Sequence, residues 1–553
     1  MTIPQCKPSG PTPARLMIVG EAPGSDEVRT GEPFVGLSGK ELTRMLHDAG
    51  ILRSDCRITN VTMERPEGND ISTFFATRTQ ATTDHKFLAG RWCSPAITSG
   101  LEALRQEVAA TNPSVILALG DTALWALTGE TGITKWRGSY LDLRPAYGGP
   151  HPTNVLVIPT YHPAAILRQW SWRFIAVQDM RRVAEAIAGR APPRPAEDFD
   201  IPHTLDYALA AIDELARSDE PLSCDIETRV GHIDCIGFAT SPTRAICFPF
   251  FSLQQPNGLW SLEDEATIVL ALRRLLSSRP IVGQNFLYDA QYIARHWGLA
   301  VIPAFDTMIA QGVAFPGLPK ALDFLSSMYL PWHRYWKDES QEADAKLDDS
   351  IRWRYNCKDC CTTWALRPHL EQTLSDLQLT KPFAFEMALF QPLLMMMLQG
   401  VSINTNLRGQ LMSELMAIQQ QYEQYFDQYA QLLPEAKANA KPWYRSPKQQ
   451  QDLFYNVLGQ APLRNRKTGN ITSDDEALEK LGKREPLLLP LTRAMQRYRS
   501  TGVFLSTFIQ APLDWDKRIR SSYNPVGTET LRFSSRADAF GYGTNLQNIP
   551  TGE

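Results

Sequence analysis

The segment LSCDIET, Leu222–Thr228, contains two acidic residues whose spacing indicates much of the chemistry of this chain. Its apolar, β-compatible residues follow Pro221 and predict a short strand. Side chains alternate across a strand, so Asp225 and Glu227 are expected to project from the same face. Two carboxylates on one face of a buried strand repel each other unless a cation lies between them, and a divalent-metal site begins in this way.

Two later segments offer further residues of the same kind. In GQNFLYDAQYIARHWG, the residues after Phe286 are expected to form a helix that places Asn285 and Asp289, four residues apart, on one face. In IRWRYNCKDCCTTWAL, Tyr355 and Asp359 have the same spacing on another predicted helix. Each pair alone is compatible with solvated surface carboxylates, but three pairs, the first on a hydrophobic strand, favour one shared site.

The patterns D-x-E, N-x-x-x-D and Y-x-x-x-D, in this order, resemble the three motifs of the DEDDy-type 3′–5′ exonucleases. These enzymes form the RNase-H-like proofreading domain of family A DNA polymerases, and FDTMIAQGVAFPGLPKALDFLSSMYL is similar to their connecting segment. The resemblance implies a site for two Mg²⁺ or Mn²⁺ ions about 3.5–4 Å apart. It implies these metal ligands: Asp225, Glu227, Asp289 and Asp359. It also implies that Tyr355 orients the attacking water, whereas Asn285, on the substrate side, positions a neighbouring ligand or the backbone.

Composition places few limits on function. The chain has 553 residues, 43% hydrophobic and 21% charged, which is ordinary for a soluble protein of three or four domains. Its net charge is −4, yet residues 441–553 contain 17 Lys and Arg against 11 Asp and Glu, and this excess suits a phosphate-binding face. The nine scattered cysteines and the lack of a signal peptide or transmembrane segment indicate a cytoplasmic protein, from a bacterium or a phage-infected host.

The first 190 residues alternate strand and helix patterns. The strands are expected in RLMIVG, SVILALG and NVLVIPT, and each is followed by a loop and a helical pattern. This order is typical of a doubly wound parallel α/β sheet, in which ligands bind at the carboxyl ends of the strands. The loops found there are GEAPG, GDTAL and TYHPAAIL, and none matches a dinucleotide or P-loop fingerprint.

These loops carry a second resemblance. GEAPG, GEPFVGLSGKEL, ITNV, ALG, WRGSY and PTYHPAAILR are similar to motifs of the uracil-DNA glycosylase superfamily, nearest its iron–sulfur branch, over residues 15–170. The resemblance implies that Glu21 lies in the water-activating loop and that Phe34 stacks on a flipped base. It also implies that Asn60 reads the base edge and that His162 stabilises the departing uracil anion.

The cysteines depart from this branch. Four cysteines are needed to hold its cluster, and only Cys93 falls where one is expected. Cys6 has no C-x-x-C partner, and Glu64 stands where another cysteine would follow. We therefore expect no iron–sulfur cluster. Two interpretations remain open for this domain, an active glycosylase or a domain retained for its fold or for docking on DNA.

The C-terminal region resembles the thumb of family A polymerases. GVSINT, SPKQQQDLFYNVLG, ITSDDEALEKL and YRSTGVFLSTFI lead into YNPVGTETLRFSS and GTNLQNIP, which are similar to the stretch before the first palm motif. The resemblance implies that Arg532, Asn545 and Gln547 contact substrate DNA, although Leu531 replaces the family's glycine. The printed sequence ends at Glu553 before any palm motif, so we expect the polymerase active site to lie outside it. A separate polypeptide carrying palm and fingers and a continuation of the same chain both stay open.

The sequence thus predicts a multidomain α/β protein. Its expected parts are a doubly wound parallel glycosylase-like domain (1–188), a Pro-rich linker (189–202), an RNase-H-like 3′–5′ exonuclease domain (203–378) and a mostly α-helical, incomplete thumb and palm segment (379–553). The expected function is that of a family A DNA polymerase with two-metal proofreading, and its partners are primer–template DNA and single-stranded 3′ ends. The alternatives are a uracil-DNA glycosylase with an accessory exonuclease and a non-catalytic primer–template binding protein.

Overall fold

The computed structural model describes these residues: 6–149, 151–255, 258–433 and 441–550. The chain divides into two compact units, Met1–Asp289 with Val301–Met387 and Ala290–Ala300 with Ala388–Glu553. The domain limits expected from the sequence stay predictions. In the described part of the chain, none of the helices combines the length and the apolar content needed to cross a bilayer.

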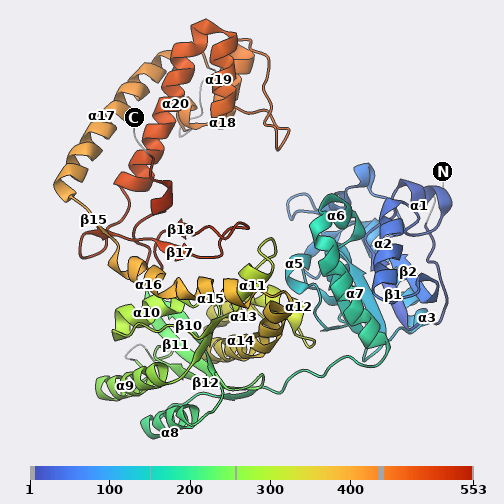
Figure 1. Ribbon diagram of the computed structural model, residues 1–553. Coiled ribbons are helices and arrows are strands. Elements are labelled where there is room, and N and C mark those ends of the chain that lie inside the picture. The colour runs from blue at the N-terminus through green and yellow to red at the C-terminus, as the bar shows by residue number, and fades with distance from the viewer. Residues whose placement is uncertain (1–5, 150, 256–257, 434–440, 551–553) are drawn as a thin grey trace. The chain divides into compact units, whose positions relative to one another are not determined.

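The N-terminal sheet has the strand order β2-β1-β6-β8-β7 (Figure 1). Its strands are β1 (Leu16–Gly20), β2 (Cys56–Asn60), β6 (Val115–Leu119), β7 (Leu141–Asp142) and β8 (Leu156–Thr160). β1, β2, β6 and β8 are parallel, and β7 runs antiparallel to β8. Leu16 and Ile18 pack into one core and Met17 and Val19 into another, because side chains alternate across β1.

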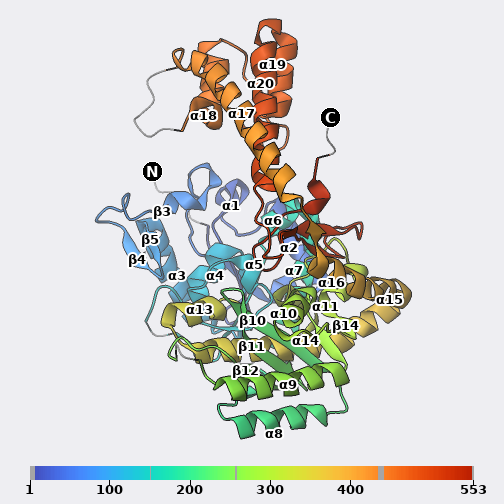
Figure 2. The ribbon, with the colours of Figure 1, turned by 90° about the vertical axis from the view of Figure 1, so that its left-hand side faces the viewer.

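Helices cover both faces of this sheet. α2 (Leu37–Asp48) and α7 (Arg173–Ile187) contribute to the core on one face, and α3 (Pro95–Thr111) and α4 (Asp121–Thr128) contribute to the core on the other. The predicted doubly wound parallel sheet is therefore confirmed. The remaining elements are the short helices α1 (Ser25–Thr30), α5 (Ile133–Trp136) and α6 (Pro163–Arg168), and the three-stranded sheet of β3 (Phe75–Ala76), β5 (Arg91–Cys93) and β4 (Lys86–Leu88) (Figure 2).

The second sheet is mixed, with the order β14-β13-β10-β11-β12-β9. Its strands are β9 (Asp198–Asp200), β10 (Leu222–Arg229), β11 (His232–Ala239), β12 (Arg244–Pro249), β13 (Ile281–Gly283) and β14 (Phe305–Asp306). β10, β11 and β12 form an antiparallel meander, while β13 runs parallel to β10. The edge strand β9 pairs in parallel with β12. Its residues fall inside the predicted linker, so this part of the linker belongs to the sheet.

The next group of helices connects or follows these strands along the chain. They are α8 (Leu205–Ala216), α9 (Leu262–Ser278), α10 (Leu287–Trp297), α11 (Thr307–Ala314), α12 (Leu322–Tyr329), α13 (Glu339–Lys346), α14 (Asp349–Asp376) and α15 (Thr380–Ala388). The long helix α14 packs across β10, β11 and β12. Cys357 and Cys360 from α14 meet Cys235 and Cys247 from the sheet in one buried cluster, so these thiols are core residues.

The second unit is mostly helical. Its elements are α16 (Phe390–Gln399), β15 (Val401–Ser402), α17 (Thr405–Ala430), α18 (Pro447–Gln451), α19 (Asp475–Arg484), α20 (Leu489–Phe504), β16 (Arg518–Ile519), β17 (Ser522–Asn524) and β18 (Ser534–Arg536). α17 and α20 lie side by side (Figures 1 and 2). Phe426, Trp443 and Tyr498 join leucines from α19 and α20 in their core. This arrangement confirms the predicted helical character of the region.

Candidate metal centre and base pocket

Three carboxylates meet on one side of β10. Asp225 and Glu227 project from the same face of the strand, and Asp359 approaches from α14, which packs against it. One oxygen of each carboxylate lies within 4.8 Å of the others. In the described residues, this is the only group of three or more acidic, histidine or cysteine side chains that could hold a metal ion. Carboxylate oxygens are the ligands that Mg²⁺ and Mn²⁺ prefer, so the donor set fits these ions.

The loop before α13 fixes Asp359 and Tyr355. Trp336 Nε1 donates to Asp359 Oδ1 (2.6 Å), and Lys337 Nζ donates to Asp359 Oδ2 (2.5 Å). The same ammonium donates to the Tyr355 hydroxyl at 3.0 Å. The i, i+4 spacing in α14 places Tyr355 one turn before Asp359, so a single lysine reaches both.

Asn356 holds Asp225 in place. Its amide Nδ2 donates to Asp225 Oδ2 (3.0 Å) and to the Asp225 backbone carbonyl (3.1 Å). The position opposite Asp225 on β11 is Gly237, and a Cβ there would overlap Asn356 Oδ1. The absence of a side chain at Gly237 therefore lets Asn356 enter between strand and helix.

Asp289 lies beside this group but is bound differently. Its Oδ1 accepts a hydrogen bond from the Ile226 backbone N–H (2.9 Å), between the two acidic residues of β10. Asp306 shapes the preceding turn, because it accepts from the backbone N–H of Phe286 (2.8 Å) and of Asn285 (3.3 Å). The structure corrects one expectation here. Asn285 has a φ of 56° and precedes α10, so it does not share a helical face with Asp289.

The buried negative charge raises the pKa of these groups. Burial and the neighbouring Asp359 raise the pKa of Asp225 to about 7, although Lys337 and Asn356 oppose the rise. Burial and Asp225 raise the pKa of Glu227 and of Asp289 well above the ordinary range. Like charges confined at low dielectric are unfavourable, so the site favours either protons or cations.

Sequence reasoning missed three of these residues. Lys337 and Trp336 lie in a loop, where no periodicity relates them to Asp359, 22 and 23 residues further on. Asn356 carried a weak signal, since it follows Tyr355 on a predicted helix. Only the packing of α14 on β10 shows that it reaches Asp225.

The second polar site is a cavity of about 370 Å³ at the carboxyl ends of β1, β2 and β8. All four residues implied by the glycosylase resemblance line it: Glu21, Phe34, Asn60 and His162. Glu21 follows β1, Asn60 ends β2 and His162 follows β8, so parallel strands deliver three of them to one sheet edge. Glu21 Oε2 accepts from Thr122 Oγ1 (2.5 Å) at the start of α4.

Close packing at Gly20 shapes the cavity. A Cβ on Gly20 would overlap Asn60 Oδ1 and lie 2.5 Å from the Phe34 ring. Phe34 itself has a φ of 57°, and Arg53 donates to its carbonyl (3.0 Å). The Phe34 ring lies 5.7 Å from the His162 ring, centroid to centroid. This geometry keeps an aromatic ring and a buried amide on the same cavity.

His162 is a neutral hydrogen-bond donor. Its Nδ1 accepts from the Ala164 backbone N–H (3.1 Å), and a neutral imidazole that accepts at one nitrogen carries its proton on the other. Burial and the nearby Arg168 lower the pKa of His162 to about 4. The ring can therefore offer Nε2–H to a developing anion without being charged.

The cysteines of this region do not fit a four-thiolate cluster. Cys6 and Cys93 are both free and buried, and Cys93 Sγ lies 3.5 Å from the Arg91 carbonyl, which can accept its S–H. Cys56 is the third cysteine of the first 190 residues, so this part of the chain supplies three thiols where the cluster needs four.

The candidate substrate residues of the second unit lie near the C-terminus. Asn545 Oδ1 accepts from the Gln547 backbone N–H (3.0 Å) and from Ser535 Oγ (2.5 Å), so it caps a short helical turn. Arg532 is exposed, and its backbone N–H donates to Thr528 Oγ1 (2.9 Å). Leu531 has a φ of 55°, a conformation suited to the glycine that it replaces. Their contact with DNA stays a prediction.

Comparisons with known proteins match both ends of the chain. The uracil DNA glycosylase superfamily model matches residues 8–185, and the DNA polymerase family A model matches residues 412–553. The type-4 uracil-DNA glycosylase of Thermotoga maritima is 37% identical over 177 residues, 31% of this chain and 78% of its own length. That of Saccharolobus solfataricus is 34% identical over 187 residues, 33% of this chain and 75% of its own length.

Two polymerases also show similarity. The DNA polymerase of Bacillus phage SP01 is 24% identical over 212 residues, 38% of this chain but only 20% of its own length. The solved POL domain of Pol1 from M. smegmatis, in complex with DNA primer-template and dNTP, aligns with a TM-score of 0.47 at 19% identity, covering 63% of this chain and 55% of its own. The chain therefore belongs to the uracil-DNA glycosylase superfamily through its N-terminal domain and carries a DNA polymerase family A domain at its C-terminus.

Proposed function

We propose that this chain is part of a family A DNA polymerase and proofreads DNA by 3′–5′ hydrolysis. The carboxylate cluster of Asp225, Glu227 and Asp359 carries this proposal, because their oxygens lie within 4.8 Å of one another beside the buried Asp289. Tyr355 lies one helical turn from Asp359, as in the DEDDy pattern. The polymerase family model at residues 412–553 supports DNA as the substrate.

The chemistry follows from the groups around the cluster. When bound, two divalent ions would lower the pKa of an attacking water and stabilise the leaving 3′ oxygen. Burial and three nearby carboxylates raise the pKa of Tyr355 far above its ordinary value, so its hydroxyl stays protonated. Tyr355 therefore acts as a donor that orients the water and not as the base. Asn356 and Trp336 hold the two carboxylates that flank this hydroxyl.

A double substitution tests the nuclease. Asp225→Ala with Glu227→Ala should remove the ions and abolish release of mononucleotides from a 3′-labelled single-stranded oligonucleotide. The matched control is Glu263→Ala with Asp264→Ala in the first turn of α9, which removes the same charge away from the site. Degradation at the parent rate by the first variant would show that the assignment is wrong, and metal-independent DNA binding without products would favour a non-catalytic clamp.

A second function is supported by the base pocket. We infer that the N-terminal domain removes uracil from DNA, because Glu21, Phe34, Asn60 and His162 line one cavity. Phe34 would stack on the flipped base, Asn60 would bind its edge, and Nε2–H of His162 would stabilise the departing anion. Glu21, oriented by Thr122, would activate the water.

Uracil release is measured with labelled single- and double-stranded DNA containing one uracil. Base-labile sites should form with the parent protein and not with the Asn60→Ala variant. If the parent forms none on either substrate while it binds both, the domain serves in docking and not in excision. A faster reaction on single strands would show that unpairing limits the rate.

A further inference from the structure

Lys337 places a cation inside the proposed nuclease site. Its side chain is 25% exposed, and its ammonium contacts Asp359 Oδ2 and the Tyr355 hydroxyl. An ordinary lysine is protonated at neutral pH, and the ammonium of Lys337 is paired with the Asp359 carboxylate. This lysine comes from the loop between α12 and α13, outside all three exonuclease-like motifs.

Lys337 donates to the Tyr355 hydroxyl and to one oxygen of Asp359, so it restricts which partners these two side chains can take. An ammonium only donates, so the Tyr355 oxygen accepts from Lys337. The Tyr355 O–H in turn donates to Asp359, which helps to raise the pKa of this tyrosine. Asp359 accepts from Trp336 at one oxygen and from Lys337 at the other. Each carboxylate oxygen has a second lone pair, and these remaining positions are where Asp359 could meet a cation.

The total charge of the site gives Lys337 a second effect, on metal binding. Four carboxylates face the site, and Lys337 with two divalent ions would bring five positive charges, one more than the carboxylates carry. A phosphodiester in the site brings one negative charge, so the loaded site would be neutral only with Lys337 present. In the absence of DNA, the ammonium repels an incoming cation across the same short distances.

We propose that Lys337 is a positioning residue of this nuclease site, where it orients the Tyr355 hydroxyl, holds Asp359 and weakens metal binding until DNA is bound. The proposal rests on the exonuclease function proposed above. Loss of the ammonium removes the donor to the Tyr355 oxygen and one charge that opposes the metal. Catalysis and metal affinity should therefore change in opposite directions.

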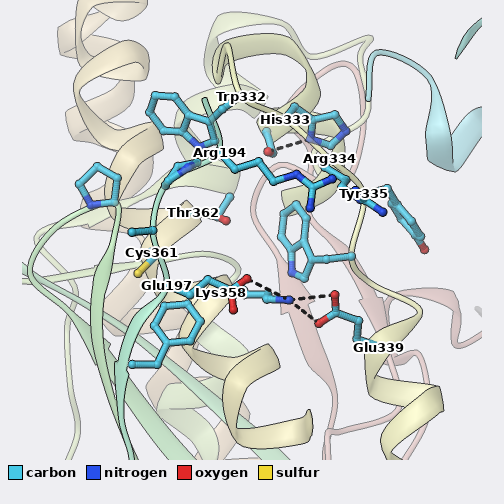
Figure 3. Close-up of a pocket in the computed structure, with 16 residues that line it drawn as sticks. Arg194, Glu197, Trp332, His333, Arg334, Tyr335, Glu339, Lys358, Cys361 and Thr362 are labelled. Atoms are coloured by element: carbon cyan, nitrogen blue, oxygen red, sulfur yellow. Dashed lines mark hydrogen bonds and ion pairs between the residues drawn. The ribbon is translucent and has the colours of Figure 1, made fainter. Parts of the chain in front are cut away.

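Lys358, on the helix α14 that carries Asp359, offers a matched control. It adjoins Asp359 in sequence and its side chain is 22% exposed, close to the value for Lys337. Its ammonium lies between Glu339 (2.8 Å) and Glu197 (3.4 Å), in a pocket of about 250 Å³ that is also lined by Trp336 (Figure 3). Lys358→Met thus removes the same charge from a partly exposed ion pair without removing a contact to Tyr355 or to the carboxylate cluster.

The experiment compares the full-length parent with Lys337→Met, Lys337→Arg and Lys358→Met. Calorimetric titration with Mn²⁺ in the absence of DNA should show three- to tenfold tighter binding for Lys337→Met, of the order given by removing one nearby charge. Its kcat on a 3′-labelled single strand should fall by about 100-fold, with KM changed less than about threefold. Lys337→Arg keeps the charge and should bind Mn²⁺ like the parent, with an intermediate kcat. Lys358→Met should match the parent in both measurements.

The outcomes separate the two proposals. If Lys337→Met loses Mn²⁺ affinity together with kcat, or leaves both unchanged, the proposed role of Lys337 is wrong. If Lys358→Met shows the same changes, the effects come from general destabilisation, and the proposed role of Lys337 is also wrong. If the parent binds Mn²⁺ but degrades no DNA, the exonuclease function fails, and the Mn²⁺ titration alone still decides whether Lys337 opposes the metal.

Discussion

The base pocket and the carboxylate centre are two ways of building a polar site. The polar groups of the pocket have hydrogen-bond partners within the protein. Thr122 donates to Glu21, and His162 is neutral and accepts from the Ala164 backbone N–H. The centre collects like charges around Asp225 and compensates them only partly with Lys337. A pocket whose polar groups are hydrogen-bonded can be complete before its ligand arrives, whereas a cluster of buried carboxylates is completed by cations.

Removal of divalent metal should produce the largest difference between the two sites. With excess EDTA, release of mononucleotides from a 3′-labelled strand should fall by more than about a thousandfold, because two ions contribute several kcal/mol to the barrier. Uracil release by the same preparation should change less than about twofold, since no described residue of the base pocket belongs to the metal-binding group. Equal loss of both activities would contradict the separation of the two sites.

His162→Ala tests the pocket side of the comparison. Loss of the Nε2–H donor should reduce the rate of uracil release by about 100-fold, the usual effect of removing one donor to a developing anion. Nuclease activity should be unchanged. The control is His85→Ala, in a loop outside the cavity. An unchanged rate in His162→Ala would place the leaving-group donor elsewhere.

Two glycines allow the same substitution to be made in each site. Gly20→Ala would press a methyl group against Asn60 and Phe34, and Gly237→Ala would press one against Asn356. Each should lower stability by about 1–3 kcal/mol, as overpacking does, and lower only the activity of its own site by about tenfold. Thermal melting and the two activity assays measure these effects. A loss of both activities in either variant would indicate global unfolding.

The pH dependence of uracil release should be the smallest effect on activity. His162 has a pKa of about 4 in the folded protein, below the ordinary value of 6.5, so the unfolded chain takes up this proton first as the pH falls. Its contribution to stability is therefore complete above about pH 6.5 and declines towards pH 4, by at most about 3 kcal/mol. Uracil release should show no titration of this histidine between pH 5 and 8. A rate step near pH 6.5 that disappears in His162→Ala would contradict the neutral ring.

Periodicity and motif order predict most of the architecture. The apolar runs that form β1, β6 and β8 predict a parallel sheet, and the alternation in Leu222–Thr228 places Asp225 and Glu227 on one face. Four of the residues that line the base pocket were predicted from motifs near the ends of the expected strands. These features depend on local patterns, because strand alternation and the ends of parallel strands are decided within a few residues.

Long-range packing decided what local patterns could not. Asp306 imposes the left-handed turn at Asn285, and Gly237 admits Asn356 to Asp225 across two elements. Lys337 reaches Asp359 from a loop whose sequence has no period. Local spacing and motif order predicted which carboxylates to examine, and Asp225, Glu227 and Asp359 lie together in the folded chain. The packing of a loop, a helix and a sheet selected Lys337 and Asn356 as their partners, because such contacts depend on how the elements pack and not on residue spacing.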